Sequence, residues 1–300
     1  MEKISPYLLL VIGILACLFS NTTNKIFSSK NPSDAFKAVG VSIFSLVSCI
    51  TLYIWGGGFG HISTYSLVLG IVFGFVTFLV SILILNAYAL GPFSYTLMLV
   101  SLSMLLPTFS GAIFWNETVS ITQYIGTALV IVCIILSVEK NGDDKKANLK
   151  WLICTGFAFL ANGSVGIIQK MHQNSPYADE LGEFLIVSFL TGAAFSALAA
   201  LVFKIKDKRE GKTNDVKYTA KDMTMFMLMF IIIGVCLATC HKVNLYLSGV
   251  LPAAVFFPAT NGGTLVLTSI TAFLFFKEKL TKKQWAGLIT GTAAVFLLTM

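Results

Sequence analysis

Residues 116–126 read NETVSITQYIG, and residues 277–287 read KEKLTKKQWAG, which is the same pattern 161 residues later. Both copies have a glutamate in second place and end in glutamine, an aromatic residue, any residue and glycine. Five matches at one register are rarely produced by chance, so they indicate two copies of one unit. The matched pairs are Glu117 with Glu278, Ser120 with Thr281, Gln123 with Gln284, Tyr124 with Trp285 and Gly126 with Gly287.

The sequence around both copies is strongly apolar. Hydrophobic residues make up 56% of the 300 residues and charged residues 12%, against roughly 45–50% and 25% in soluble domains. Residues 65–115 contain no charge, and a membrane-spanning helix needs about 20 apolar residues. The composition therefore predicts an all-α polytopic membrane protein with about ten transmembrane helices. The predicted spans are 7–27, 36–55, 65–90, 94–115, 121–138, 151–169, 184–203, 223–247, 251–276 and 285–300.

Charge patterning predicts that the two halves are inverted five-helix repeats. Residues 1–138 form the first repeat, 139–150 a polar linker, and 151–300 the second repeat. Because each repeat has an odd number of spans, the second must enter the membrane in the opposite sense. Of the 21 Lys and Arg, 18 lie in odd-numbered loops, Lys3 and Lys170 are predicted at the opposite membrane surface, and Lys242 lies inside a span. The positive-inside rule then places odd-numbered loops in the cytoplasm and both termini outside the cell membrane.

This pattern resembles the EamA-like branch of the drug/metabolite transporter superfamily over essentially the whole chain. The closing motifs FWNETVSITQYIG and FFKEKLTKKQWAG carry the resemblance, together with Pro107 ten residues before Glu117. The second half has Thr268 at the equivalent position. The resemblance implies a secondary transporter that moves a small metabolite or drug-like solute by alternating access around a midplane cavity between the repeats. No span has a central carboxylate, which departs from relatives that couple transport to protons through an acidic first helix.

Polar residues recur along one face of the first and sixth spans. Asn21 and Asn24 in the first span, and Asn162 and Gln169 in the sixth, are spaced to share a helix face. The two sets occupy equivalent registers 145 residues apart, where Lys25 also matches Lys170. Transporters bind solute near the midplane, so we predict that these residues line the path. Interhelical hydrogen bonding, worth about 0.6 kcal/mol on average, is the alternative.

The ninth span contains PATNGG at residues 258–263. A proline followed by paired glycines can interrupt backbone hydrogen bonding and free polar groups for a ligand. This predicts a broken or kinked helix at Pro258, Gly262 and Gly263, with Asn261 as a solute ligand. Close packing between helices is the alternative. Pro107 is a weaker signal of the same kind in the fourth span.

Lys242 lies inside the eighth span, five residues before its predicted end. It is predicted to be either a counter-charge for an anionic group on the solute or a snorkelling side chain, since the membrane surface is about 7.5 Å away. The residues of the repeat motif are assigned to structure and not to binding. They are Glu117, Gln123, Gly126, Glu278, Gln284 and Gly287.

The remaining residues argue against other classes of function. His61, His172 and His241 are far apart in sequence, and neither a P-loop nor an H-E-x-x-H or G-x-S-x-G motif occurs. The six cysteines lie in apolar runs without a C-x-x-C pair and are predicted to be small packing residues. No enzymatic activity, cofactor or metal site is therefore predicted. An integral membrane enzyme, or a channel or scaffold with the same fold, is the alternative to a transporter.

The predicted partners follow from the same features. They are a small-molecule solute and the lipid bilayer. The formal charge of +7 reflects loop topology, so nucleic acid is not among them. A homodimer is left open.

Overall fold

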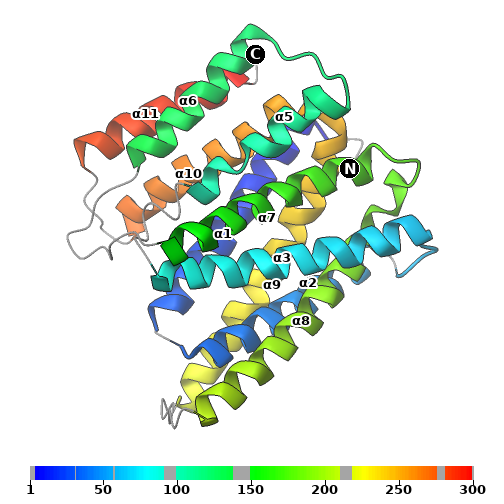
Figure 1. The fold of residues 1–300 in the computed structure, drawn as a ribbon, viewed down its shortest axis with the longest axis vertical. Helices are drawn as coiled ribbons and strands as arrows, with labels where there is room; N and C mark the ends of the chain where they lie inside the picture. The colour runs from blue at the N-terminus through cyan, green and yellow to red at the C-terminus, as the bar shows by residue number, and fades with distance from the viewer. Residues whose placement is uncertain are drawn as a thin grey trace. The chain divides into compact units, whose positions relative to one another are not determined.

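The computed structural model of the protein describes residues 4–30, 32–56, 58–90, 99–137, 149–209, 218–275 and 281–298. All regular secondary structure in these ranges is helical, as the composition predicts, and no strand occurs among them. Figure 1 shows the helices. They are α1 (Pro6–Ser29), α2 (Asp34–Gly56), α3 (Thr64–Leu90), α5 (Leu105–Phe114), α6 (Ile121–Ser137), α7 (Leu149–Gln173), η1 (Ala178–Glu180), α8 (Leu181–Arg209), α9 (Ala220–Val250), α10 (Ala253–Phe275) and α11 (Lys282–Leu298).

Each of the ten apolar segments predicted from the sequence overlaps one of these helices, and residues 94–98 of the fourth segment lie outside the described residues. Ahead of α5, Ser103 N donates to Val100 O at 3.1 Å and Leu106 N donates to Ser103 O at 3.0 Å. Bonds that span three residues form a tighter turn than an α-helix, and this turn separates α5 from helical residues 99–102. Six helices of the described chain are long and apolar enough to cross a membrane. They lie at Pro6–Asn24, Asp34–Gly56, Thr64–Ile84, Leu149–Gln173, Ala178–Arg209 and Ala220–Val250.

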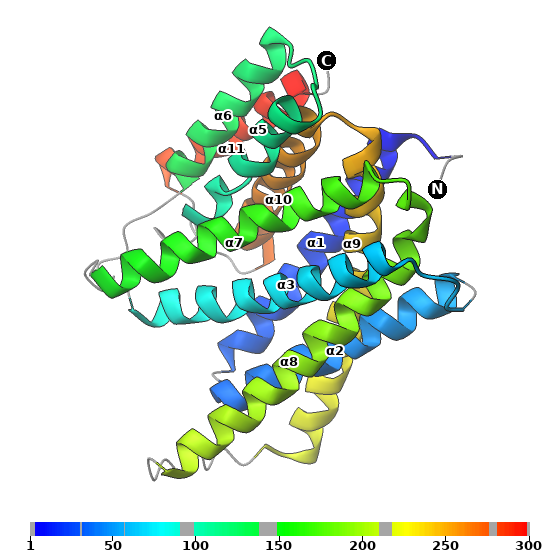
Figure 2. The same ribbon diagram turned by 45° about the vertical axis from the view of Figure 1, so that its right-hand side comes forward.

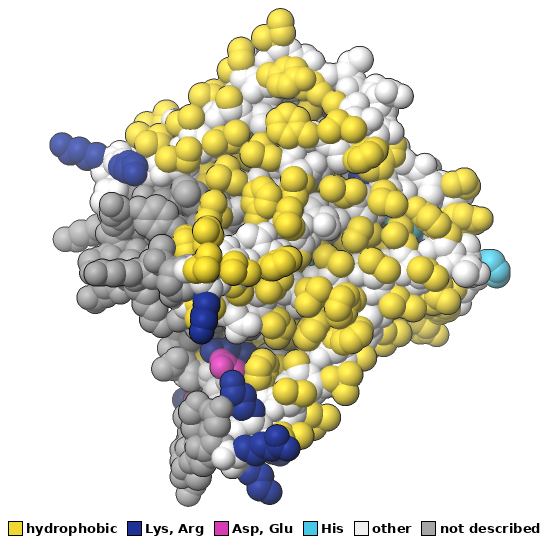
Figure 3. All heavy atoms as spheres, in the orientation of Figure 1, with side chains coloured by type: hydrophobic (Ala, Val, Ile, Leu, Met, Phe, Trp, Pro, Cys, Tyr) yellow, Lys and Arg dark blue, Asp and Glu magenta, His cyan; other side chains and the backbone are white. Residues whose placement is uncertain are grey.

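Large apolar side chains are exposed on the outside of these helices. Ile54, Ile113 and Ile289 are each 68% exposed. Figure 3 shows hydrophobic side chains over most of the visible face, with Lys and Arg mainly near its edges. Soluble proteins rarely expose continuous apolar patches larger than a few hundred Å², whereas lipid accepts them. The surface is therefore consistent with a polytopic membrane protein.

The helices group into two compact units. Unit 1 comprises Met1–Ile14, Leu79–Ser175 and Asn244–Met300, and unit 2 comprises Leu15–Phe78 and Pro176–Val243. Neither unit is one half of the sequence, because each contains helices from both halves. The division into two sequence repeats stays a prediction, and most of the linker predicted at 139–150 lies outside the described residues.

Unit 1 is built around α10, which packs against α5, α6 and α11, while α6 and α11 pack along each other and α5 also contacts α7. Figure 2 shows α6 and α11 side by side. Glycines allow their close approach. A Cβ on Gly126 of α6 would lie 2.7 Å from Leu298 Cγ, and one on Gly291 of α11 would lie 2.6 Å from Cys133 Sγ. Small residues at helix interfaces are typical of membrane proteins.

Unit 2 is held by α2 packing along α8 and by a cluster of aromatic side chains from α1, α2 and α9. Phe27 lies 5.5 Å from Phe226 and 5.1 Å from Phe230 between ring centroids, both edge-on, which is a favoured arrangement for aromatic pairs. The hydroxyl of Ser48 in α2 donates to the carbonyl of Gly234 in α9 at 2.7 Å. The core of unit 2 therefore joins α2 to helices far along the chain.

The loops of unit 2 meet in two separate groups. Ser63, just before α3, donates its hydroxyl to Glu180 in η1 at 2.6 Å, so the α2–α3 loop lies beside the α7–α8 loop. Phe36 at the start of α2 lies 5.0 Å from Tyr218 ahead of α9, between ring centroids, so the α1–α2 loop lies beside the α8–α9 loop. Counted in the order of the predicted spans, the first contact joins two even-numbered loops, the second and the sixth. The second contact joins two odd-numbered loops, the first and the seventh. This is the order expected of helices that cross one layer in turn.

Candidate functional site

The turn between α9 and α10 lies in unit 1. It places the C-terminal end of α9 next to the N-terminal end of α10. Only Leu251 and Pro252 separate Val250, the last residue of α9, from Ala253, the first of α10. The carbonyl of Pro252 accepts bonds from the N–H groups of Val255 and Phe256 at 3.0 and 2.9 Å, so it starts α10. Helix ends leave backbone carbonyls and N–H groups without intrahelical partners. Proline has no side-chain oxygen to cap α10, so other residues must do so.

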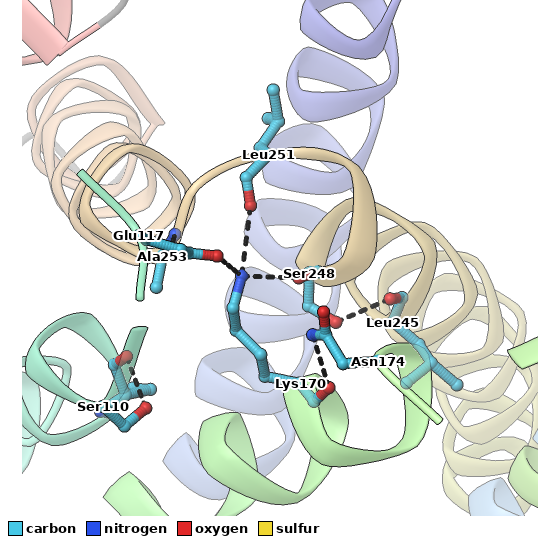
Figure 4. A network of polar contacts seen from close by, with 9 residues as sticks. Ser110, Glu117, Lys170, Asn174, Leu245, Ser248, Leu251 and Ala253 are labelled. Atoms are coloured by element: carbon cyan, nitrogen blue, oxygen red, sulfur yellow. Dashed lines mark hydrogen bonds and ion pairs between the residues drawn. The ribbon is translucent and has the colours of Figure 1, made fainter. Parts of the chain in front are cut away.

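Lys170 supplies the cap for α9. It lies in the last turn of α7 and is only 1% exposed. Its ammonium donates to the carbonyl of Ser248 at 3.1 Å and, at 3.5 Å, to that of Leu251. Figure 4 shows the side chain extending from α7 into the turn. A cation at these carbonyls is favourable because they form the negative end of the helix dipole.

Glu117 supplies the cap for α10 and also binds Lys170. One carboxylate oxygen accepts the N–H of Ala253 at 2.7 Å, and the other forms an ion pair with the Lys170 ammonium. An anion at the first N–H groups of a helix is stabilising for the same electrostatic reason. The three acceptors around Lys170 use all three donors of its ammonium group.

The α5–α6 loop aims Glu117 at this turn. Trp115 N and Glu117 N both donate to Gly111 O at 3.2 Å, which ends α5. Asn116 has a φ of 51°, a left-handed conformation that asparagine tolerates better than most residues. A Cβ on Gly111 would lie 2.6 Å from Ala253 Cβ, so glycine is needed for α5 to come this close to α10.

The pair is a functional candidate because ionisable groups among apolar helices are costly unless they are paired. Removing one partner of a buried ion pair typically costs about 3–5 kcal/mol, since the other charge is left uncompensated. In membrane proteins such residues are functional candidates by default. The pair joins Glu117 from the first half of the sequence to Lys170 and the α9–α10 turn from the second half.

The residues predicted to bind solute are divided between the units. Asn162 of α7, in unit 1, donates its side-chain amide to Ser103 Oγ at 2.6 Å and to Val100 O at 3.4 Å. This is the interhelical hydrogen bonding given above as the alternative role. Gln169, next to Lys170, is 5% exposed. A lining role for both residues stays a prediction.

The other four predicted ligands have different surroundings. Asn261 donates its amide to the carbonyl of Phe257 on its own helix at 2.9 Å. In unit 2, Asn21 is exposed and Asn24 is half-buried on α1. Lys242 lies 6.0 Å above the centroid of the Trp55 ring, at the outer limit of a cation–π contact.

The predicted break in the ninth span is not observed. α10 runs as one helix from Ala253 to Phe275 with Pro258 inside it. Proline removes one backbone donor, but the helix continues on both sides of it. The prediction of a broken helix at residues 258–263 was therefore wrong. Gly262 is buried, and a Cβ on Gly263 would lie 2.8 Å from Ile14 Cδ1. Close packing, the stated alternative, therefore accounts for Gly263.

Pro107 likewise lies within a helix. It is the third residue of α5 and is buried. A proline in the first turn removes only an N–H that has no acceptor within α5, and the turn at 103–104 that separates α5 from helical residues 99–102 lies just ahead of it.

The repeat motif is a helix cap. Ser120 precedes α6, and its hydroxyl accepts the N–H of Gln123 at 3.2 Å, while Gln123 Oε1 accepts the N–H of Ser120 at 3.1 Å. These reciprocal bonds form a capping box, with Ser or Thr followed three residues later by Glu or Gln. Thr281 and Gln284 have the same spacing before α11, and Gly287 is buried. Glu278 and the Gln284 side chain lie outside the described residues.

Two predictions about single residues are corrected. Lys170 was placed at the membrane surface by sequence, whereas it is buried in the ion pair. Its sequence signal was the match between Lys25 and Lys170 across the repeat. Cys17 and Cys240 in unit 2 form a disulfide with a Cα–Cα distance of 5.7 Å, so these two are not simple packing residues. Their separation of 223 residues leaves no local motif to reveal them.

Comparison with known proteins bears on the fold. No family model and no curated protein matches the chain. Among solved structures, 28 chains match. One, described only as "Crystal structure of protein", aligns with a TM-score of 0.75 and 13% identity over 98% of this chain and 96% of that one. At this identity the likeness shows the fold alone.

Proposed function

We propose that the protein is a secondary transporter, of the EamA-like type in the drug/metabolite transporter superfamily, that carries a small solute across the cell membrane by alternating access. Three features support the proposal. The helices include six of membrane-spanning length, the closing motif occurs twice, and the fold matches a solved structure along nearly the whole chain.

The packing of equivalent helices is the observation that carries the proposal. α6 and α11 begin and end at residues that differ by the same 161 positions as the two motifs, and they pack along each other. α5 packs on its equivalent α10, and in unit 2 α2 packs on its equivalent α8. Inverted repeats related by a two-fold axis bring equivalent helices together near that axis. Such repeats are the usual basis of alternating access in secondary transporters.

We assign the Lys170–Glu117 pair to one end of this transport cycle. Glu117 lies in the α5–α6 loop, which is the fourth loop in the order of the predicted spans. The pair joins this loop to the α9–α10 turn, which is the eighth. Both loops are therefore even-numbered. When two repeats rock against each other, contacts between them at one membrane face form in one state and break in the other. The pair would then stabilise the state that is closed at the face of the even-numbered loops.

Solute counterflow in vesicles tests the proposal. The purified chain is first screened for thermal stabilisation by amino acids, nucleosides, sugar phosphates and cationic drugs. A stabilising solute is then loaded into vesicles, and uptake of its labelled form is followed. A carrier gives transient accumulation above equilibrium, whereas a channel gives only equilibration and a scaffold or an enzyme gives no uptake. Either of the last two results would contradict the proposal.

A further inference from the structure

The end of α8 in unit 2 combines an apolar surface with a concentrated basic charge. Lys204, Lys206, Lys208 and Arg209 fall within the last six residues of the helix, and all are exposed. Figure 3 shows Lys and Arg side chains gathered where α8 ends in Figure 1, next to hydrophobic ones. The positive-inside rule accounts for basic residues in this loop. The rule does not, however, require that these basic residues lie on the last turns of a helix.

The basic residues continue the apolar side of the helix. Leu201, Val202 and Ile205 are 58%, 62% and 54% exposed, and they lie on one side of α8. Lys208 and Arg209 follow Ile205 by three and four residues, which places them on that same side one turn further on. The side of α8 that faces lipid therefore ends in two cations.

The distance of Lys208 and Arg209 beyond the end of the predicted span is close to the thickness of the lipid headgroup layer. The predicted span ends at residue 203, so Arg209 lies about 9 Å beyond it at 1.5 Å per residue. The polar layer on each side of a bilayer is about 5–8 Å thick. Lysine and arginine stems can also bend back toward the polar layer while their apolar parts remain in contact with lipid. Lys208 and Arg209 can therefore reach lipid phosphates.

Among the described residues, no carboxylate forms an ion pair with either of the two cations. Asp34 pairs with Lys37 at 3.0 Å, and Asp222 accepts a hydrogen bond from the Thr219 hydroxyl at 2.6 Å. In the described part of the chain, neither Lys208 nor Arg209 has a carboxylate oxygen within 4.0 Å. Within the described part of the chain, both side chains are exposed and can therefore contact an anion from outside the protein.

We propose that the end of α8, through Lys208 and Arg209, binds the headgroups of anionic phospholipids. The arginine fork matches phosphate oxygens in pairs, and lysine adds a point charge. Each basic residue near an anionic membrane strengthens binding by about five-fold. The proposal depends on membrane insertion of the chain and not on its transport activity.

Native mass spectrometry of the purified full chain tests this surface. Dioleoyl phosphatidylglycerol is the anionic probe, and dioleoyl phosphatidylcholine is the neutral one. The wild-type chain should prefer the anionic lipid, and the double variant K208Q/R209Q should lose about 30-fold in affinity for it, because two basic residues are removed. R209K, which keeps the charge, should retain most of the binding.

The matched control is K282Q/K283Q, which removes two exposed charges at the start of α11. This control should change the affinity by less than three-fold, and melting temperatures in neutral detergent show that each variant is folded. Equal losses in both double variants, or none in K208Q/R209Q, would overturn the proposal. Competition by millimolar inorganic phosphate at the same site would overturn it as well, because the ligand would then be free phosphate and not lipid.

Discussion

Substitution of Lys170 by methionine tests the ion pair most sharply. Methionine keeps the length of the apolar stem and removes the ammonium. The carbonyls of Ser248 and Leu251 then lose their donor, and the Glu117 carboxylate, 20% exposed, loses its counter-charge. We expect a loss of about 3–5 kcal/mol in the free energy of unfolding, as for other broken buried pairs.

The converse change, Glu117→Gln, should cost a similar amount for a different reason. A glutamine oxygen can still accept the N–H of Ala253, but the buried Lys170 ammonium keeps only its two carbonyl partners. The double variant K170M/E117Q removes both charges, so it should be at least as stable as either single variant. The interaction free energy from this cycle should therefore be about 3 kcal/mol or more.

Unfolding in mixed detergent micelles, followed by circular dichroism, measures these values. Lys242→Met is the matched control, because Lys242 is only half-buried and contacts Trp55 at the limit of a cation–π interaction. It should cost less than about 1 kcal/mol. Additive losses in the double variant, or single losses near that of the control, would refute the assignment of Lys170 and Glu117 as a coupled buried pair.

Three further substitutions follow from the contacts. Ser120→Ala removes the cap of α6 and should lower the free energy of unfolding by about 1 kcal/mol. The control Thr290→Ala, on the exposed side of α11, should have little effect. Equal losses in the two variants would argue against the capping box. Gly291→Ala places a Cβ 2.6 Å from Cys133 Sγ and should cost about 1–3 kcal/mol, while Gly156→Ala, with open space around it, should be neutral or stabilising. Asn162→Ala should cost only about 0.6 kcal/mol, and a solute affinity that also falls would support its lining role, while an unchanged affinity would leave only the bond to Ser103.

The positions of the helices could be predicted from the sequence, whereas their ends could not always be. Apolar runs of about 20 residues locate helices because lipid permits few other structures. The predicted segment at 94–115 contains helical residues 99–102 and then α5, separated by a turn with shorter hydrogen bonds, which hydropathy does not reveal. Pro258 was expected to break or kink α10, and the helix continues through it without a break.

The candidate site was harder to predict because its residues are distant in sequence. Glu117 was assigned to structure because it lies near a helix end where water could satisfy its charge, and Lys170 was assigned to the membrane surface from the distribution of basic residues. Their contact depends on the α9–α10 turn, which brings Ser248 and Ala253 to the same place. The capping box could have been recognised, because Ser120 and Gln123 have the spacing that defines it. The matches of Lys25 with Lys170 and of Glu117 with Glu278 showed that both charges recur, but not that they pair.

The orientation of the two motif loops tests the inverted repeat most directly. Single cysteines are introduced at Thr118 and at Lys283, which are both exposed, in a background whose native cysteines are replaced by alanine. Intact cells are then treated with a membrane-impermeant maleimide, with and without permeabilisation. We predict that the cysteine at 118 is labelled in intact cells and the one at 283 only after permeabilisation. Labelling of both from the same side of the membrane would contradict the inversion of the second repeat.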